Sequence, residues 1–360
     1  MKILFVIEPR DNAGNMHAIA NYTRVAPELG HEIAFYGPPQ PTVIDGLYLP
    51  TWNARFSTDV GAFDRVIYLF ESKLYRAKKL QEVALLANIP REHRYILDAD
   101  SRFHPFVILD GYDRSHRDEA ERAEWLDYYD SLTDRIIKPT LAPSDDPRVT
   151  TLPFFGFDPG LIVPPEAAPP KRYDILHVGH NWWRWKEVSE QLLPAFEQIR
   201  GQVGEIGFLG LWWNEIPDWT EKLDLDPAIR LDPEAFRRLK IRIEPPCHYT
   251  EVIRTMSSAR INIFTQRPFL AHVKHLTLRY FEEFCADTIP LLMLDADLAE
   301  AVYGTAGREL TLPGRVADKL LDALQRPDHY REIVEDVRRH LLKHQHYHRR
   351  VEELVATLAD

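Results

Sequence analysis

The stretch HVGHNWWRWKE, residues 177–187, places three tryptophans, an arginine and a lysine directly behind an apolar run that reaches a glycine. Residues 175–178 are typical of a buried parallel strand, and helical spacing begins at Glu187. The stretch therefore predicts a turn from a strand into a helix that carries two positive charges. In open α/β sheets, ligands bind at this end of the strands.

Strand-like and helix-like segments alternate along the rest of the chain. Strands are predicted at residues 3–7, 33–36, 66–70, 95–97, 136–137, 174–178, 206–209, 241–243, 261–265 and 290–294. Helices are predicted at residues 16–29, 73–87, 118–132, 187–199, 249–258, 276–285, 330–342 and 347–358. This alternation predicts the α/β class, with parallel sheets that helices cover on both faces.

Four prolines interrupt the alternation in VPPEAAPPKRYD, residues 163–174, and indicate a linker. We therefore predict two Rossmann-like, doubly wound domains, at residues 1–162 and 173–342, joined by a linker at 163–172. Residues 343–360 are expected to form a C-terminal helix that packs back toward the N-terminal domain. Two such domains facing each other leave a cleft for ligands between the carboxyl ends of their strands.

Composition favours a globular cytoplasmic protein. The 360 residues are 45% hydrophobic and 28% charged, and two cysteines cannot form a disulfide framework. Too few apolar residues open the sequence for a signal peptide, and no apolar run reaches the length of a transmembrane segment. The net charge of −11 argues against nucleic acid as the main partner and slightly favours a soluble acceptor.

The turn at 177–187 lacks the glycine patterns of dinucleotide-binding and P-loop proteins, which disfavours both classes. Arg184 and Lys186 can still bind phosphate there, together with the free N–H groups of a helix N-terminus. Tryptophans in such a turn are more often core residues than ligand contacts. The two basic side chains are the better candidates for a binding role.

A second constellation lies at residues 265–295, as a strand, a polar loop, a helix and another strand. The loop offers four cationic or titratable side chains to anions, namely Arg267, His272, Lys274 and His275. The helix carries Arg279, Glu282 and Glu283, and a carboxylate there can accept hydrogen bonds from both hydroxyls of a ribose. The alternative is an ordinary surface ion pair.

LRYFEEFCADTIPLLMLD, residues 278–295, resembles the Arg-x-Phe-Glu helix and the following strand of GT-B glycosyltransferases, especially the spore-maturation-type and group 1-like members. Four other segments resemble landmarks of that group in the expected order, namely LPFFGFDPGL at 152–161, YDILHVGHNWWRWKE at 173–187, HYTEVIRTMSSARINIF at 248–264 and HQHYHRRVEELV at 344–355. The resemblance covers roughly residues 150–358. It implies a metal-independent glycosyltransferase that uses a nucleotide-diphosphate sugar as co-substrate and needs no other cofactor.

The resemblance also implies roles for single residues. Glu282 matches the ribose-binding glutamate, although an alignment on Pro290 selects Glu283 instead. Arg184 and Lys186 match positions that contact the donor diphosphate. The other residues expected on the donor side are Gly179, Asn181, His248, Tyr249, Arg267, His272, Lys274 and Arg279. Two departures affect the sugar contacts, because Lys274 replaces a second glutamate and Asp287 with Thr288 replaces a pair of glycines.

The N-terminal half is expected to hold the acceptor and the catalytic base. His17 and Asp100 are the candidate bases, and Gly14, Asn15 and Asp98 are expected on the acceptor side. If the transfer retains configuration, the donor phosphate can itself act as the base. His17 lies within a predicted helix, where a lone histidine is more often structural.

Two other functions fit the same architecture. A nucleotide-sugar 2-epimerase would release free nucleotide diphosphate without an acceptor, and a scaffold protein would bind the nucleotide sugar without turnover. The histidines at positions 340, 344, 346 and 348 could in principle bind a metal. A polar helix face is the commoner explanation, so no metal site is predicted.

Overall fold

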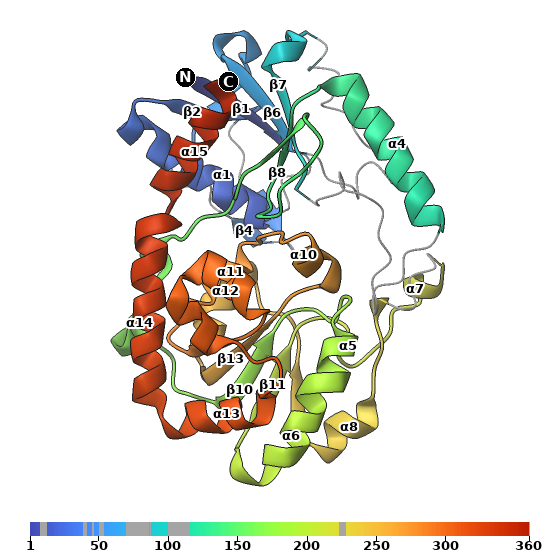
Figure 1. Cartoon of the computed structure of the whole chain (residues 1–360), viewed down its shortest axis with the longest axis vertical. Coiled ribbons are helices and arrows are strands. Elements are labelled where there is room, and N and C mark those ends of the chain that lie inside the picture. Colours follow the sequence, from blue (N-terminus) through green and yellow to red (C-terminus); the bar gives the residue numbers. More distant parts are fainter. Residues whose placement is uncertain are drawn as a thin grey trace.

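Two parallel β-sheets, one from each half of the chain, form the framework of the protein in the computed structural model (Figure 1). The structure describes residues 1–7, 13–38, 42–44, 47–49, 54–69, 86, 88–99, 116–222 and 228–359. Residue 99 is followed by a gap that contains Asp100, and the predicted helix at 73–87 also lies outside the described residues, apart from position 86.

The N-terminal sheet has the strand order β5-β2-β1-β6-β7-β8-β9, and every pair in it is parallel. Its strands are β1 (Lys2–Ile7), β2 (Glu32–Tyr36), β5 (Phe56–Ser57), β6 (Arg65–Leu69), β7 (Arg94–Leu97), β8 (Ile136–Lys138) and β9 (Val149–Thr151). Strand β3 (Thr42–Ile44) pairs antiparallel with β4 (Leu47–Leu49) in a separate two-stranded sheet. Five of the six residues of β1 are buried, as expected for the centre of a sheet covered on both faces.

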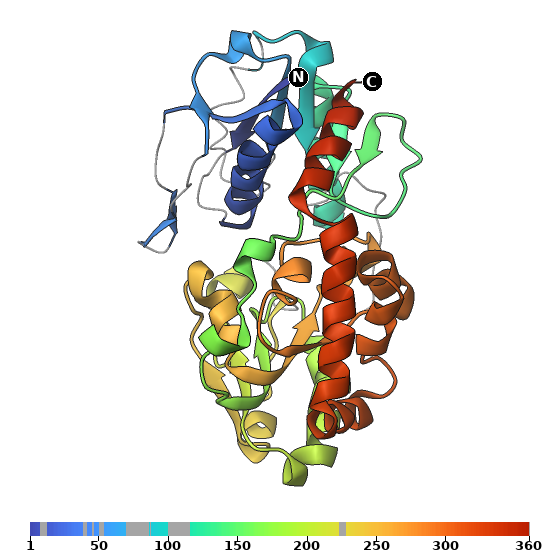
Figure 2. The ribbon, with the colours of Figure 1, turned by 90° about the vertical axis from the view of Figure 1, so that its left-hand side faces the viewer.

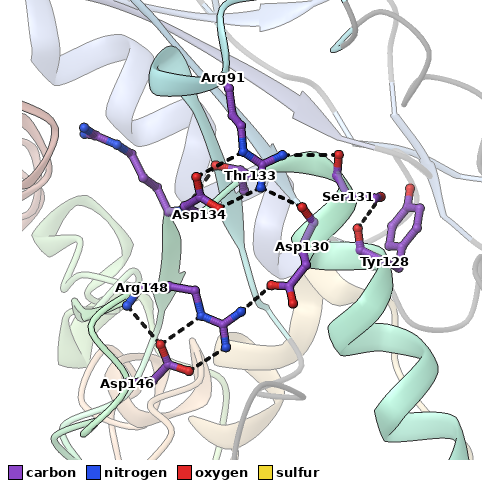
Figure 3. Close-up of polar contacts among 9 residues, drawn as sticks. Arg91, Tyr128, Asp130, Ser131, Thr133, Asp134, Asp146 and Arg148 are labelled. Atoms are coloured by element: carbon purple, nitrogen blue, oxygen red, sulfur yellow. Dashed lines mark hydrogen bonds and ion pairs between the residues drawn. The ribbon is translucent and has the colours of Figure 1, made fainter.

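Helices α1 (Ala13–Val25) and α4 (His116–Leu132) accompany this sheet, with 3₁₀ turns η1 (Ala26–Leu29), η2 (Val60–Ala62) and η3 (Arg91–His93). Arg91 holds the carboxyl end of α4, because its guanidinium donates to the carbonyls of Asp130 and Ser131 and to both carboxylate oxygens of Asp134 (Figure 3). A cation at this end also complements the helix dipole.

The C-terminal sheet has the order β12-β11-β10-β13-β14 and is also entirely parallel. Its strands are β10 (Tyr173–Val178), β11 (Ile206–Leu209), β12 (Ile241–Glu244), β13 (Ala259–Thr265) and β14 (Ile289–Met293). Its helices are α5 (Trp185–Glu187), α6 (Leu193–Ile199), α7 (Trp219–Lys222), α8 (Pro233–Arg238), α9 (Val252–Met256), α10 (Pro268–His272), α11 (Arg279–Glu282), α12 (Ala296–Tyr303), α13 (Val316–Gln325) and α14 (Pro327–His344). A π-helical turn at Val188–Leu192 joins α5 to α6.

These elements confirm the predicted α/β class and the positions of the ten predicted strands to within about two residues. The sequence missed β3, β4, β5 and β9, which have only two or three residues each and hence almost no periodicity. It also missed five helices, namely α7, α8, α10, α12 and α13. The predicted helix at 276–285 is wrong in length, because the α-helical part, α11, covers only Arg279–Glu282 and turns surround it.

The last helix, α15 (Tyr347–Ala359), crosses to the N-terminal half and packs against α1 and η1 (Figure 2). Arg350 is 2% exposed and fixes this crossing, since it donates to the carbonyl of His344 (3.0 Å) and the side chain of Gln345 (2.9 Å) and pairs with Glu353 (3.0 Å). A search of the described residues finds no helix long and apolar enough to span a bilayer.

A second bridge joins the two halves beside the cleft. The N–H of Leu141 donates to the carbonyl of Lys274 (3.0 Å), and the N–H of Leu276 donates to the carbonyl of Pro139 (3.2 Å). The hydroxyl of Thr140 donates to the carbonyl of Val273. The loop between β13 and α11 is therefore paired through its backbone with the segment that follows β8.

Candidate active site

A cavity of about 890 Å³ opens at the carboxyl ends of the strands of the C-terminal sheet. Residues that follow β10, β11, β12 and β13 line it, and they include the predicted site residues Gly179, Arg184, Tyr249, Arg267 and Arg279. Glycine is required where the first two turns meet, because a Cβ at Gly210 would lie 2.1 Å from the carbonyl oxygen of Gly179. The strand-end position expected from HVGHNWWRWKE is therefore confirmed.

A smaller chamber of about 280 Å³ adjoins this cavity and lies between the two halves of the molecule. Gly14, Asn15 and Ala99 line it from the N-terminal half, and Glu282 and His275 line it from the C-terminal half. The two spaces share five lining residues, namely Tyr249, Arg267, Leu270, Thr277 and Arg279. We call them the large cavity and the interdomain chamber.

Three arginines line the large cavity, from three different parts of the sequence. The pKa of Arg184 is lowered to about 9 by burial, with further contributions from the positive charges of Arg267 and Arg279. Such mutual repulsion indicates a surface built to receive an anion, which would restore the ordinary preference for the charged guanidinium. Glu187 lies close to Arg184, but burial raises the pKa of its carboxyl group to about 8. At neutral pH it is therefore largely protonated and compensates little of the positive charge.

The two neighbouring glutamates of α11 occupy different environments. Glu282 lines the interdomain chamber, and its carboxylate lies 3.5 Å from Nε of Arg279. Glu283 is buried away from both spaces and accepts a hydrogen bond from the side chain of Asn262, and burial raises its pKa to about 7. The structure thus brings Glu282, rather than Glu283, to the chamber.

His17 lies at the junction of the two halves, with Nε2 3.8 Å from the carboxylate of Asp158 and 3.1 Å from the amide of Asn21. Its ring centroid is 6.4 Å from those of Tyr249 and Tyr347. Burial lowers the pKa of His17, although the charge of Asp158 opposes that shift. His17 does not line the chamber or the large cavity, so its place in the structure fits a role in the domain junction better than contact with substrate.

Six other predicted residues line neither space. Asn181 is buried and donates from its amide to the carbonyls of Trp212 and Arg230, and Asp98 is buried with its carboxylate accepting from Tyr129. His248 begins the turn at Tyr249–Glu251 and bonds Thr250. The remaining three are the partly buried Lys186 and the exposed His272 and Lys274. Asp100 lies outside the described residues.

Tryptophans line the large cavity although the sequence favoured a core position for them. Trp183 is buried, but Trp182, Trp212 and Trp219 are partly exposed and line the wall. The motif at 177–187 contained the signal for Trp182, whereas Trp212 and Trp219 reach the site only because β11 is the neighbour of β10. No periodicity shows that pairing.

No group of three or more His, Cys, Asp or Glu side chains in the described ranges could hold a metal ion. His340 and His344 approach each other, with ring centroids 4.6 Å apart. They form a pair at helical spacing without a third ligand among those residues.

Comparison with known proteins gives a consistent picture. Residues 191–356 match the sequence model of a glycosyl transferase-like family, and no curated protein sequence matches the chain. The fold is similar to that of the β-glucosyltransferase of T4 phage in complex with UDP-glucose, at 13% identity, 99% coverage of both chains and a TM-score of 0.54. It is also similar to an α-glucosyltransferase in complex with UDP, at 12% identity, coverage of 100% of this chain and 99% of the other, and a TM-score of 0.59.

These matches confirm the predicted fold, because the solved structures share the GT-B architecture over the whole chain. Residues 191–356 are similar to a glycosyl transferase-like family. At 12–13% identity the solved structures establish the shared fold, and the assignment to the spore-maturation-type group stays a prediction.

Proposed function

We propose that the protein holds a nucleoside-diphosphate hexose across the large cavity and the interdomain chamber and transfers the hexose to an acceptor hydroxyl, without a metal ion. The observation that carries this proposal is the set of three arginines, Arg184, Arg267 and Arg279, on the wall of one cavity. Guanidinium groups bind phosphate oxygens in a bidentate manner and can replace the metal that neutralises a leaving diphosphate in other enzymes.

The roles of the other residues follow from their positions. Glu282 accepts hydrogen bonds from the ribose hydroxyls, because its carboxylate lines the chamber beside Arg279. Gly14 and Asn15 line the same chamber from the N-terminal half. In the transfer, the bond between the anomeric carbon and the diphosphate oxygen breaks, and a bond to the acceptor oxygen forms. The acceptor proton goes to the diphosphate or to a base, for which Asp100 is the candidate from the sequence.

The test is a titration of the protein with UDP, GDP, dTDP and ADP by thermal shift, followed by calorimetry with the nucleotide that stabilises it most. We expect Arg184→Ala to lower the affinity for that nucleotide by about 10-fold to 100-fold, since a hydrogen bond to a charged group contributes about 1.5–3 kcal/mol. Lys186→Ala is the matched control in the same turn. Its loss of nucleotide affinity should be much smaller, because Lys186 does not line the cavity.

Three results would contradict the proposal. Unchanged affinity in Arg184→Ala would remove the arginines from the donor site. If the wild-type protein showed no thermal shift with any of the four nucleotides, a different class of ligand would be favoured. Release of nucleoside diphosphate from the sugar donor together with an epimerised sugar, in the absence of any acceptor, would identify a 2-epimerase instead of a transferase.

A further inference from the structure

Three indole rings form one end of the large cavity. The ring centroids of Trp182, Trp212 and Trp219 are 5.6–5.8 Å apart in each pair. All three side chains are partly exposed and line the cavity, and they pack on the buried Trp183 and Ile229. They come from two strand-end turns and from α7, so the platform exists only in the folded protein.

The backbone beneath these rings is fixed in an unusual conformation. Trp183 and Trp212 have φ angles of 58° and 66°, in the left-handed region that bulky residues rarely adopt. The buried amide of Asn181 ties the turns together by donating to the carbonyls of Trp212 (2.9 Å) and Arg230 (2.8 Å). Strain retained in this way at a cavity wall is typical of functional sites.

Exposed apolar side chains also lie on the loop between β11 and α7. Of the three large apolar side chains that are exposed among the described residues, two lie in this loop, namely Leu211 (37%) and Ile216 (51%). We call Trp182, Leu211, Trp212, Ile216 and Trp219 the tryptophan patch. Leu211 lines the large cavity together with the three tryptophans, and exposed apolar side chains gathered at a cavity mark a binding surface more often than chance exposure does.

The charges around the tryptophan patch select among its possible ligands. Residues 211–222 contain three exposed carboxylates, Glu215, Asp218 and Glu221, against one exposed cation, Lys222. This excess of negative charge disfavours phosphate groups of nucleic acid or of anionic lipid on this loop. A neutral sugar chain fits both features, because the C–H faces of pyranose rings stack on indoles and carboxylates accept hydrogen bonds from sugar hydroxyls.

The position of the tryptophan patch also fits a ligand other than the nucleoside. Glu282 lines only the interdomain chamber and the tryptophans line only the large cavity, whereas Arg267 and Arg279 line both. The arginines therefore lie between the proposed ribose carboxylate and the patch. A ligand on the patch would lie beyond the diphosphate as seen from Glu282.

We propose that the tryptophan patch binds a neutral oligosaccharide that serves as the acceptor, so that the enzyme extends or decorates a glycan. The role of the oligosaccharide as acceptor rests on the proposed function, whereas its binding can be measured by itself. The probes are neutral linear oligosaccharides, namely maltoheptaose, cellohexaose, chitohexaose and a mannohexaose. Binding is followed by calorimetry and by the change in tryptophan fluorescence.

We expect one of these oligosaccharides to bind the wild type. Trp219→Ala should lower the affinity for that oligosaccharide by about tenfold, which corresponds to about 1.4 kcal/mol. Trp219→Phe should restore most of the affinity, because a phenyl ring still offers a stacking face. Leu342→Ala is the control, since Leu342 is an exposed apolar side chain on α14 outside the patch. The affinity of each folded variant for the preferred nucleoside diphosphate should stay within about twofold of the wild type.

The same set of variants separates the rival explanations. A loss of nucleotide affinity in Trp219→Ala, without oligosaccharide binding by the wild type, would assign the patch to the nucleobase and overturn the proposal. Binding of a fluorescent DNA duplex or of neutral phosphatidylcholine vesicles that Trp219→Ala abolishes would overturn it as well. If no nucleotide binds while the oligosaccharide result holds, the proposed transferase function fails but the glycan site stands.

Discussion

At the scale of single residues, the surroundings of each side chain decide which of two adjacent carboxylates can meet a ligand. Glu282 lines the interdomain chamber beside Arg279, whereas Glu283 points into the core and accepts a bond from Asn262. One position along a helix turns a side chain by about 100°, so both cannot face the same space. The ribose role that the resemblance left open between them therefore falls to Glu282 in our proposal.

This assignment predicts a difference between ribonucleotides and 2′-deoxyribonucleotides. The wild type should prefer the ribonucleotide, and Glu282→Gln should reduce that preference because the amide loses the charge-assisted bonds to the hydroxyls. Glu283→Gln is the matched control and should retain the preference, whatever its effect on stability. Calorimetry with the ribo and deoxy forms of the same diphosphate measures it, and a preference that survives in Glu282→Gln would place the ribose elsewhere.

At the scale of elements, β10 is the strand on which the C-terminal sheet and the cavity both depend. It lies at the centre of the five-stranded order, and its residues 175–178 are all buried. His177 is the polar member of that run, and its Nδ1 lies 2.9 Å from the carbonyl of Ile263 on β13. Burial, aided by the charge of Arg184, lowers the pKa of His177 to about 3, so the ring is neutral in the folded protein.

A neutral buried histidine makes stability depend on pH. The unfolded chain binds a proton at His177 below its ordinary pKa of 6.5, whereas the folded chain does so only near pH 3, so the free energy of unfolding falls as the pH drops through this range. Between pH 7 and pH 5 this histidine should remove about 2 kcal/mol. Urea unfolding at both pH values should show that loss in wild type and in the exposed-site control His329→Gln, but a clearly smaller one in His177→Gln. Equal losses in all three proteins would show that His177 is not the group responsible.

At the scale of the whole molecule, two sets of contacts hold the halves together on either side of the cleft. The backbone bridge between residues 139–141 and 273–276 lies beside the interdomain chamber, and His275 belongs to both. On the other side, α15 leaves the C-terminal half and packs on α1, with Arg350 buried at the crossing (Figure 2). The shape of the chamber thus depends on contacts between segments more than 100 residues apart.

We expect Arg350→Met to lower the free energy of unfolding by about 3 kcal/mol, because the variant leaves the carbonyl of His344 and the amide of Gln345 without their donor. Arg349→Met is the matched control at the next position. Arg349 is exposed and pairs with Glu352 and with Glu353, which keeps its pair with Arg350 in this variant, so the loss of Arg349 should cost less than about 1 kcal/mol. Chemical denaturation measures both values, and equal effects of the two substitutions would contradict the role of Arg350.

The sequence by itself determined the class of the protein. Regular alternation of apolar runs and helical spacing predicted the ten longer strands, and the motifs at 173–187 and 278–295 predicted a GT-B glycosyltransferase with Arg184 in its cavity. These features are local, because a buried strand and an amphipathic helix need only their own periodicity to be recognised. Elements of two or three residues, such as β5 and β9, carry too little of that signal.

Only the tertiary structure decided which side chains share a space. Lys186 lies two residues from Arg184 yet does not line the cavity, and Lys274 contributes a backbone carbonyl to the bridge between the halves instead of a side chain to the donor. Trp212 and Trp219 join Trp182 because β11 pairs with β10. Such groupings depend on strand order and on the direction of each side chain, and neither quantity repeats along the sequence in a way that a single chain reveals.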